Sequence, residues 1–364
     1  MKIFSTYNLG NIQLKNRIVM APMTRSRAIN NIPNELIAKY YEQRAAAGLI
    51  ITEGTAPSPN GLGYARIPGI FNQEQIEDWK KVTDAVHRKN GKIFVQLMHT
   101  GRVSHIDNMP EGAKIVAPSP VKLEGEMYTD QNGMQAYPVP KEMTVEEIEQ
   151  AQNEFVQAAK NAIEAGFDGV ELHGANGYLI DQFINPTTNK HNDDFGGSIE
   201  NRSRFAIEVA RKVSEEIGSE ETGIRFSPYG AASGMKVFEG LEDTYEYLAK
   251  KLGELKLAYI HVVDHSAMGA PKVTDSVKEK IRNTFGRTII LSGGYDKERA
   301  EKELNENKGE LVAFGKPFIS NPDFVERIKK DVELSSPDFS TFYTPGEKGY
   351  TDYSLMNKSQ LSYT

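Results

Sequence analysis

The sequence predicts an α/β fold, a single (β/α)8 TIM barrel that spans residues 1–364. Eight short apolar runs rich in β-branched residues alternate with longer amphipathic segments, the pattern of strands and helices in a parallel sheet. The chain of 364 residues contains no Gly-, Ser- or Pro-rich linker and no break in composition that would divide it. Eight such units in a chain of this length are typical of a barrel.

The predicted strands are short, with three to six residues each. They cover 18–20, 49–53, 92–97, 169–172, 223–226, 258–263, 288–291 and 311–314. The predicted helices cover 73–90, 144–165, 201–217, 241–255, 275–285 and 297–303. Thr144 and Glu147 have the spacing of a capping box, which marks the start of the second of these helices.

Three segments lie outside the alternation of strands and helices. Residues 1–16 form a polar, turn-rich pair of short runs that we expect to cap the bottom of the barrel. Residues 110–143 contain five prolines and form a long excursion after the third strand, of the kind that shapes a substrate mouth or forms a surface hairpin. Residues 335–364 are expected to form a tail over the barrel mouth.

The amino-acid composition argues against several classes of binding partner and cofactor. The net charge is -7 and no block of Lys or Arg is present, so neither nucleic acid nor an anionic membrane is expected to bind. Without cysteine the chain has no disulfide, no Cys-ligated zinc and no Fe–S cluster. A polar N-terminus and the lack of a long apolar run predict a soluble, unprocessed cytoplasmic protein that acts on small molecules, as a monomer or weak homo-oligomer.

The most informative motif follows the strand predicted at 169–172. His173, Asn176 and Tyr178 emerge just beyond its carboxyl end, which is where barrel enzymes place their catalytic residues. An imidazole and an amide three residues apart can bind one substrate oxygen, while a phenol beside them can donate a proton. The arrangement fits the reduction of a polarised double bond.

Other strand ends carry polar groups suited to a planar heterocycle. Thr24 follows the first strand and Gln96 lies at the end of the third, and together they offer donors and acceptors. Arg225 lies inside a predicted strand, where an unpaired guanidinium is costly. Either an anionic ligand or a salt bridge with Glu53 or Glu171 would offset that cost.

The last two strands end in glycine turns. Gly293 and Gly294 follow the seventh strand, and Gly315 and Lys316 follow the eighth. These are the positions of the usual phosphate site of a barrel, where glycines let backbone N–H groups approach the phosphate. An alternative use of the polar residues is a metallohydrolase, with a metal held by His99, His173 and His261.

Together these motifs resemble the old yellow enzyme family of FMN-dependent ene-reductases, and most closely its branch of N-ethylmaleimide reductase and pentaerythritol tetranitrate reductase-like proteins. The resemblance runs through 40–45, 63–64, 96–102, 173–204 and the tail at 342–353. It implies bound FMN, with Pro22, Met23 and Thr24 against the isoalloxazine, Gln96 and Arg225 on its pyrimidine edge, and Gly293, Gly294, Gly315 and Lys316 around the phosphate.

The resemblance also implies an NAD(P)H:flavin oxidoreductase with two half-reactions at one site. NADPH or NADH reduces the flavin and leaves, and an electrophilic alkene conjugated to a carbonyl, imide or nitro group then takes its place. The resemblance assigns catalysis to His173 and Asn176, which bind the activating oxygen, and to Tyr178, which protonates the α-carbon. It assigns the substrate pocket to Tyr64, Met98 and Tyr343. A flavin-binding stress or redox sensor with incidental turnover is a third possibility.

The sequence departs from the family at three of these positions. Lys316 stands where an Arg is usual, and an ammonium cannot form the two-pronged contact of a guanidinium with phosphate. Met98 stands where the nearest relatives carry Trp, which leaves a softer and roomier pocket wall. Asn176 replaces the second His of a His-x-x-His pair, and both pairs occur in the family.

Overall fold

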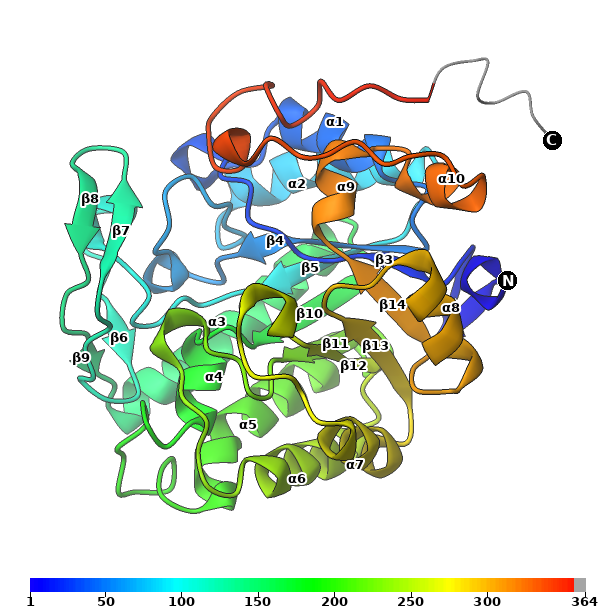
Figure 1. Ribbon diagram of the computed structural model, residues 1–364. Helices are drawn as coiled ribbons and strands as arrows, with labels where there is room; N and C mark the ends of the chain where they lie inside the picture. The colour runs from blue at the N-terminus through cyan, green and yellow to red at the C-terminus, as the bar shows by residue number, and fades with distance from the viewer. Residues whose placement is uncertain (357–364) are drawn as a thin grey trace.

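The structure is a computed structural model, and it describes residues 1–356. Eight parallel strands close into a barrel in which chain neighbours pair, and the last strand pairs with the first (Figure 1). They are β3 (Ile18–Met20), β4 (Leu49–Thr55), β5 (Ile93–Leu97), β10 (Gly169–Gly174), β11 (Thr222–Phe226), β12 (Tyr259–Val263), β13 (Thr288–Ser292) and β14 (Leu311–Phe314). The predicted TIM barrel and its eight strands are confirmed.

Helices surround the barrel and connect its strands. All six predicted helices are confirmed, as α2 (Gln73–His87), α3 (Val145–Glu164), α5 (Ile199–Ile217), α6 (Leu241–Glu254), α7 (Asp275–Phe285) and α8 (Lys297–Asn305). The capping box of α3 is present, because the Thr144 side chain accepts from the Glu147 amide and the Glu147 carboxylate accepts from the Thr144 amide. Short 3-10 turns are η1 (Lys2–Phe4), η2 (Ile29–Asn31), η3 (Pro59–Gly61), η4 (Ile106–Asn108), η5 (Ala232–Gly234), η6 (Ser266–Met268) and η7 (Phe339–Thr341).

Four helices were not predicted from the sequence. They are α1 (Glu35–Gln43), α4 (Leu179–Ile184), α9 (Lys316–Ser320) and α10 (Phe324–Lys329). A signal for α1 was present, because Asn34 caps it by accepting from the amide of Ile37. The other three have five or six residues, too few to show a helical period in sequence.

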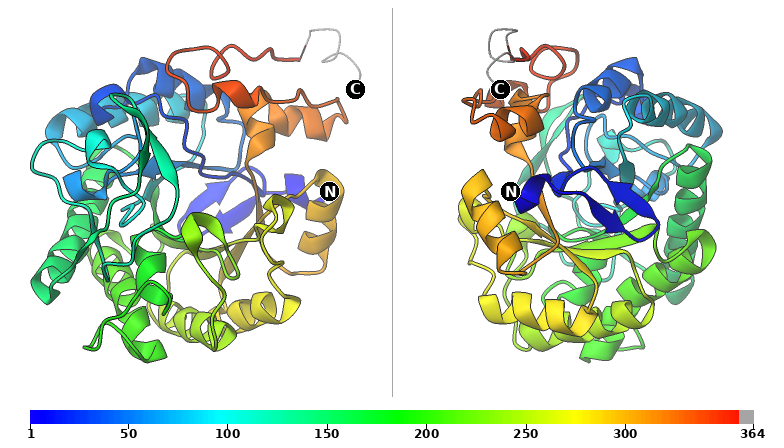
Figure 2. Two further views of the ribbon diagram at one scale, coloured as in Figure 1. Left: turned by 60° about the vertical axis from the view of Figure 1, so that its left-hand side comes forward. Right: turned by 90° about the vertical axis from the view of Figure 1, so that its right-hand side faces the viewer.

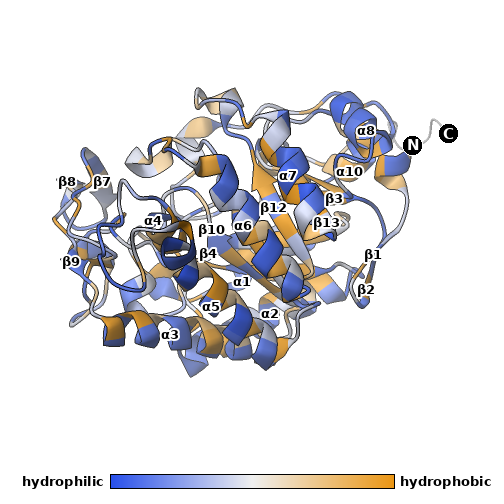
Figure 3. Cartoon of the chain, turned by 90° about the horizontal axis from the view of Figure 1, so that it is seen from below, coloured by the Kyte–Doolittle hydropathy of each residue, from blue (hydrophilic) through white to orange (hydrophobic). Residues whose placement is uncertain are grey.

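The core has two layers. Apolar residues of the helices pack against the outward side chains of the strands, and a smaller cluster fills the barrel interior. In Figure 3 apolar residues gather on the barrel strands near β12, while polar residues mark much of α6 and α7. In α3, α5 and α7 apolar residues recur at helical spacing, so each helix has an apolar face toward the barrel and a polar face away from it.

The N-terminal segment forms the antiparallel hairpin β1 (Tyr7–Leu9) and β2 (Ile12–Leu14). Its buried Leu9 and Leu14 belong to the cluster inside the barrel, together with Phe94 and Tyr259. The right-hand view of Figure 2 shows this blue hairpin across one end of the barrel. Its position agrees with the bottom cap expected from the sequence.

The excursion after β5 contains β6 (Val116–Ala117), β7 (Glu126–Thr129), β8 (Gly133–Ala136) and β9 (Lys141–Glu142). Strands β7 and β8 form an antiparallel hairpin that projects from the body of the molecule, and β6 pairs with β9 in parallel (Figure 1). Met127 and Thr129 of the hairpin are buried.

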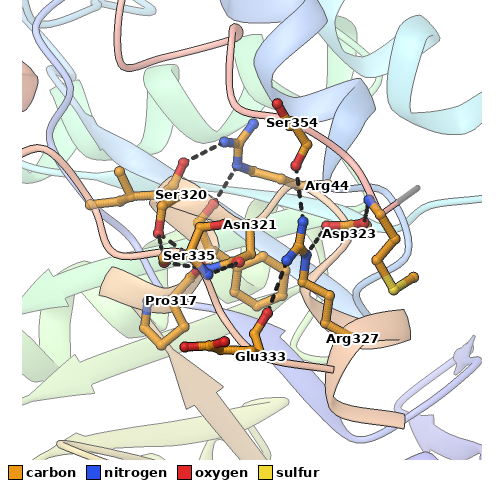
Figure 4. A network of polar contacts seen from close by, with 12 residues as sticks. Arg44, Pro317, Ser320, Asn321, Asp323, Arg327, Glu333, Ser335 and Ser354 are labelled. Atoms are coloured by element: carbon orange, nitrogen blue, oxygen red, sulfur yellow. Dashed lines mark hydrogen bonds and ion pairs between the residues drawn. The ribbon is translucent and has the colours of Figure 1, made fainter. Parts of the chain in front are cut away.

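Two buried arginines hold the segment after β14: Arg44 joins it to the end of α1, and Arg327 joins α10 to the tail (Figure 4). Arg44 donates to the carbonyls of Phe318 and Ile319 at 2.8 and 2.9 Å, and Arg327 donates to the carbonyl of Ser354 at 3.0 Å. Of the tail predicted at 335–364, the part up to residue 356 is described, and residues 357–364 lie outside the described residues. Within residues 1–356 no helix is both long and apolar enough to cross a membrane.

Candidate active site

A cavity of about 580 Å³ opens at the carboxyl ends of the barrel strands. All eight barrel strands, or the loops directly after them, contribute to its wall. All but one of the predicted site residues line it, namely Pro22, Met23, Thr24, Gln96, Met98, His173, Asn176, Tyr178, Arg225, Gly293, Gly294, Gly315, Lys316 and Tyr343. The exception is Tyr64, which contacts a lining residue.

The tautomer of His173 follows from its contacts. The amide N–H of Ala175 donates to Nδ1 of His173 at 3.3 Å, so Nδ1 is an acceptor and the ring proton lies on Nε2. Burial, followed by the positive charge of Arg225, holds the pKa of His173 well below its usual range. His173 is therefore neutral at physiological pH and can offer Nε2–H to an oxygen in the cavity.

Asn176 has a left-handed backbone conformation, with φ of 62°. This geometry is accessible to asparagine, and its amide N–H donates to Oγ of Ser227 at 2.9 Å. The side-chain Oδ1 is buried without a hydrogen-bond partner among the described residues. An unpartnered polar group on a cavity wall is a feature expected where a ligand binds.

Tyr178 follows within the same turn and donates its hydroxyl proton to the hydroxyl of Tyr64 at 3.1 Å. Its ring lies edge-on to the His173 ring, with the centroids 4.8 Å apart. Burial raises the pKa of Tyr178 to about 12. The phenol therefore keeps its proton throughout the neutral range, next to the His173 imidazole.

Gln96 of β5 and Arg225 of β11 lie on the two strands that pair with β10, and Arg225 is in register with His173. A salt bridge of Arg225 with Glu53 or Glu171, one of the two alternatives, is not formed among the described residues. The Glu171 carboxylate instead contacts Gln96 and His261, and one oxygen of Glu53 accepts from the amide of Arg25. The buried Nε of Arg225 has no partner, which favours the other prediction, an anionic ligand in the cavity.

The glycine turns after β13 and β14 also line the cavity. Gly293 has φ of 126°, and a Cβ there would lie 2.1 Å from the carbonyl oxygen of Asp264, so the backbone itself requires glycine. At Gly315 a Cβ would meet nothing closer than Sδ of Met23 at 3.5 Å, so crowding does not explain that glycine. Lys316 is exposed, and its ammonium lies 5.5 Å from the centre of the Phe339 ring.

The histidines proposed for a metal do not converge. His99 lines a separate cavity of about 190 Å³, and His261 is fully buried beside Glu171. Within residues 1–356 no group of three or more His, Cys, Asp or Glu side chains is placed to hold a metal ion. The metallohydrolase alternative therefore lacks a ligand set in the described part of the chain.

Several residues that line the cavity were missed from the sequence. Asp264 and His265 follow β12, and Ser292 ends β13, so their place at strand ends was a usable signal. Phe342 comes from the C-terminal segment beside the predicted Tyr343, and its place in the tail that carries the resemblance was a usable signal.

Comparisons with known proteins agree with one another. Residues 2–335 match the model of the family described as NADH:flavin oxidoreductase / NADH oxidase. A relative, 12-oxophytodienoate reductase 7 of Oryza sativa subsp. japonica, is 39% identical and is matched over 98% of this chain and 95% of its own length.

Solved structures show the same likeness. Morphinone reductase in complex with tetrahydroNAD is 41% identical with a TM-score of 0.94, and the match covers 99% of both chains. An old yellow enzyme homologue from Zymomonas mobilis is 38% identical with a TM-score of 0.93, over 98% of this chain and 100% of that chain.

Proposed function

This chain belongs to the NADH:flavin oxidoreductase / NADH oxidase family and is an FMN-dependent NAD(P)H alkene reductase of the old yellow enzyme type, and from that premise we propose how its residues act. The reaction that we propose is ping-pong reduction of activated alkenes, with proton donation from Tyr178. The observation that carries this proposal is the position of His173, Asn176 and Tyr178 on one wall of one cavity.

The cavity has groups that fit FMN. Arg225 brings a buried guanidinium with an unpartnered Nε, which suits the electron-rich pyrimidine edge of a flavin. Gln96 lies on the same side, and Pro22, Met23 and Thr24 form the wall after β3. Gly293, Gly294, Gly315 and Lys316 remain for the phosphate. When bound, FMN accepts a hydride from a reduced nicotinamide and passes it to the alkene.

His173 and Asn176 bind the activating oxygen of the alkene. The neutral His173 imidazole donates from Nε2, because Nδ1 already accepts from the Ala175 amide. The side-chain Nδ2 of Asn176 is the second donor that we propose, because its backbone N–H already donates to Ser227 and its Oδ1 can only accept. Two donors placed where negative charge develops stabilise the transition state by a few kcal/mol each.

Tyr178 supplies the proton. A phenol with a pKa of about 12 stays protonated at neutral pH and gives up its proton only to a strongly basic carbon. The Tyr64 hydroxyl lies within hydrogen-bond distance and stabilises the phenolate that remains. Met98 and Tyr343 line the cavity and shape the space for the alkene.

We propose that the nicotinamide and the alkene use the same cavity in turn, because the residues proposed for the flavin and for the alkene all line it or contact its lining. NADPH and NADH remain alternatives as the reductant, because the sequence contains no dinucleotide-binding glycine fingerprint. Cytoplasmic location and a monomeric or weakly oligomeric state also stay predictions.

The experiment that tests the proposal is an anaerobic visible spectrum of the purified protein. A flavin band that bleaches with NADPH or NADH and returns with 2-cyclohexenone would establish both half-reactions. A band that bleaches but does not return with any enone, imide or nitroalkene would contradict the proposed substrate class and favour the sensor alternative.

A further inference from the structure

Glu171 is a fully buried carboxylate inside the barrel, one layer below His173 on β10. Glu171 pairs in register with Gln96 of β5, and both lie on strands whose ends form the cavity. A carboxylate in a barrel interior is costly unless its oxygens are bonded and its charge is balanced. The hydrogen-bond partners of the Glu171 carboxylate therefore deserve a functional explanation as well as a structural one.

Both carboxylate oxygens of Glu171 have partners. Oε1 accepts from Nε2 of Gln96 at 2.8 Å, and Oε2 lies 2.8 Å from Nδ1 of His261. Burial lowers the pKa of His261, although the negative charge of Glu171 opposes this, so the ring is neutral and donates from Nδ1. The nearby positive charge of Arg225 balances the carboxylate without a direct ion pair.

These contacts fix the orientation of the Gln96 side chain. The NH2 group of Gln96 faces Glu171, because its Nε2 donates the hydrogen bond and the carboxylate oxygen accepts it. The amide oxygen is then the end of Gln96 left for the cavity that this residue lines. A flavin carries a ring N–H on its pyrimidine edge, and an amide oxygen is a suitable acceptor for it.

We propose that Glu171 is a positioning residue for the cofactor, which it serves by holding the Gln96 amide with its oxygen toward the pyrimidine edge of FMN. The inference rests on the proposed function, in which Gln96 faces the flavin. Without the carboxylate, the Gln96 side chain is free to turn its NH2 group toward the flavin N–H. Two donors would then face each other, and no hydrogen bond could form between them.

The test is the dissociation constant of FMN, measured from the flavin fluorescence released when the holoenzyme is diluted. Glu171→Gln keeps the shape of the side chain but can both donate and accept, so FMN should bind about tenfold more weakly, the loss of roughly one hydrogen bond. Gln96→Met should weaken binding to a similar extent. In the double variant, Glu171→Gln should cause little further loss of FMN affinity, because the Gln96 side chain that Glu171 orients is no longer present.

Asp168→Asn is the matched control. Asp168 precedes the same strand β10 at the end away from the cavity, where its carboxylate accepts from the Ile93 amide at 2.9 Å. The Asp168→Asn substitution should leave the affinity for FMN unchanged. If Glu171→Gln does not fold, Glu171→Asp gives the same comparison, because it keeps the charge but withdraws the oxygens from Gln96.

The outcomes separate the two proposals. Wild-type affinity in Glu171→Gln, or an equal loss with and without Gln96, would overturn the positioning role of Glu171 while leaving the site intact. Unchanged affinity in Gln96→Met would instead contradict the assignment of Gln96 to the flavin, and with it the proposed arrangement of the cofactor.

Discussion

The amide N–H of Gly177 donates a hydrogen bond to the carboxylate of Asp181 over 2.9 Å. On the other side of the same residue, the Gly177 carbonyl accepts from Nε2 of Gln182 at 2.7 Å. The first turn of α4 thus holds both backbone polar groups of the residue between Asn176 and Tyr178. We expect these two hydrogen bonds to fix the spacing between the side chains of Asn176 and Tyr178.

Asp181→Asn should change how stability depends on pH. Burial raises the pKa of Asp181 from 3.8 to about 7, so between these values the folded protein binds a proton that the unfolded chain has lost. Stability therefore falls as pH rises from about 4 to 7, by on the order of 4 kcal/mol at most. Urea unfolding of the Asn variant should lack this fall. An identical pH profile in both proteins would show that Asp181 does not titrate in this range.

Tyr178→Phe should slow reduction of the alkene far more than reduction of the flavin. The hydroxyl is needed only in the second half-reaction, and loss of a general acid typically costs about 10² to 10⁴ in rate. Stopped-flow measurement of each half-reaction checks this. Tyr64→Phe removes the neighbouring hydroxyl and should have a smaller effect on the same step. Equal slowing of both half-reactions by Tyr178→Phe would exclude it as the proton donor.

Alkene reduction by the wild type should show no titration of Tyr178 or His173 between pH 6 and 9. The pKa of Tyr178 lies at about 12, above this range, and that of His173 well below its usual value. Single-turnover rates with 2-cyclohexenone across this range provide the measurement. An inflection that disappears in Tyr178→Phe would place the pKa of the phenol within the range.

Lys316→Arg should strengthen FMN binding. A guanidinium can contact phosphate through two parallel hydrogen bonds, whereas an ammonium acts as a point charge. We expect the FMN dissociation constant to fall several-fold at low salt. Lys302→Arg, on the exposed side of α8, is a control for the change of side chain alone. Equal affinities for Lys316→Arg and the wild type would argue against a phosphate at this position.

Arg66 joins three segments around the cavity and offers a test of the pocket rim. Its guanidinium donates to the carbonyls of Ser26 at 3.0 Å and Tyr343 at 2.8 Å, and pairs with Asp130 at the turn of the β7–β8 hairpin. Arg66→Ala should free Tyr343 and raise KM for the alkene several-fold, with little change in flavin reduction. Asp130→Asn, which leaves both carbonyl contacts, should have a smaller effect on KM.

The sequence predicted the barrel well because its strands and longer helices have strong local signals. Apolar runs with β-branched residues mark buried strands, and Thr144 with Glu147 marks a helix start. The short helices α4, α9 and α10 were missed because five or six residues show too little periodicity. Their position depends on packing against the barrel.

The sequence by itself determined which residues stand at the strand ends, because strand order in a barrel follows chain order. His173, Asn176 and Tyr178 could therefore be placed together before any coordinates. Only the tertiary structure decided which partner each buried charge takes. Glu171 bonds to Gln96 and His261, and Arg225 has no ion pair within residues 1–356. Those choices depend on register and side-chain reach between strands far apart in the chain, which no local pattern encodes.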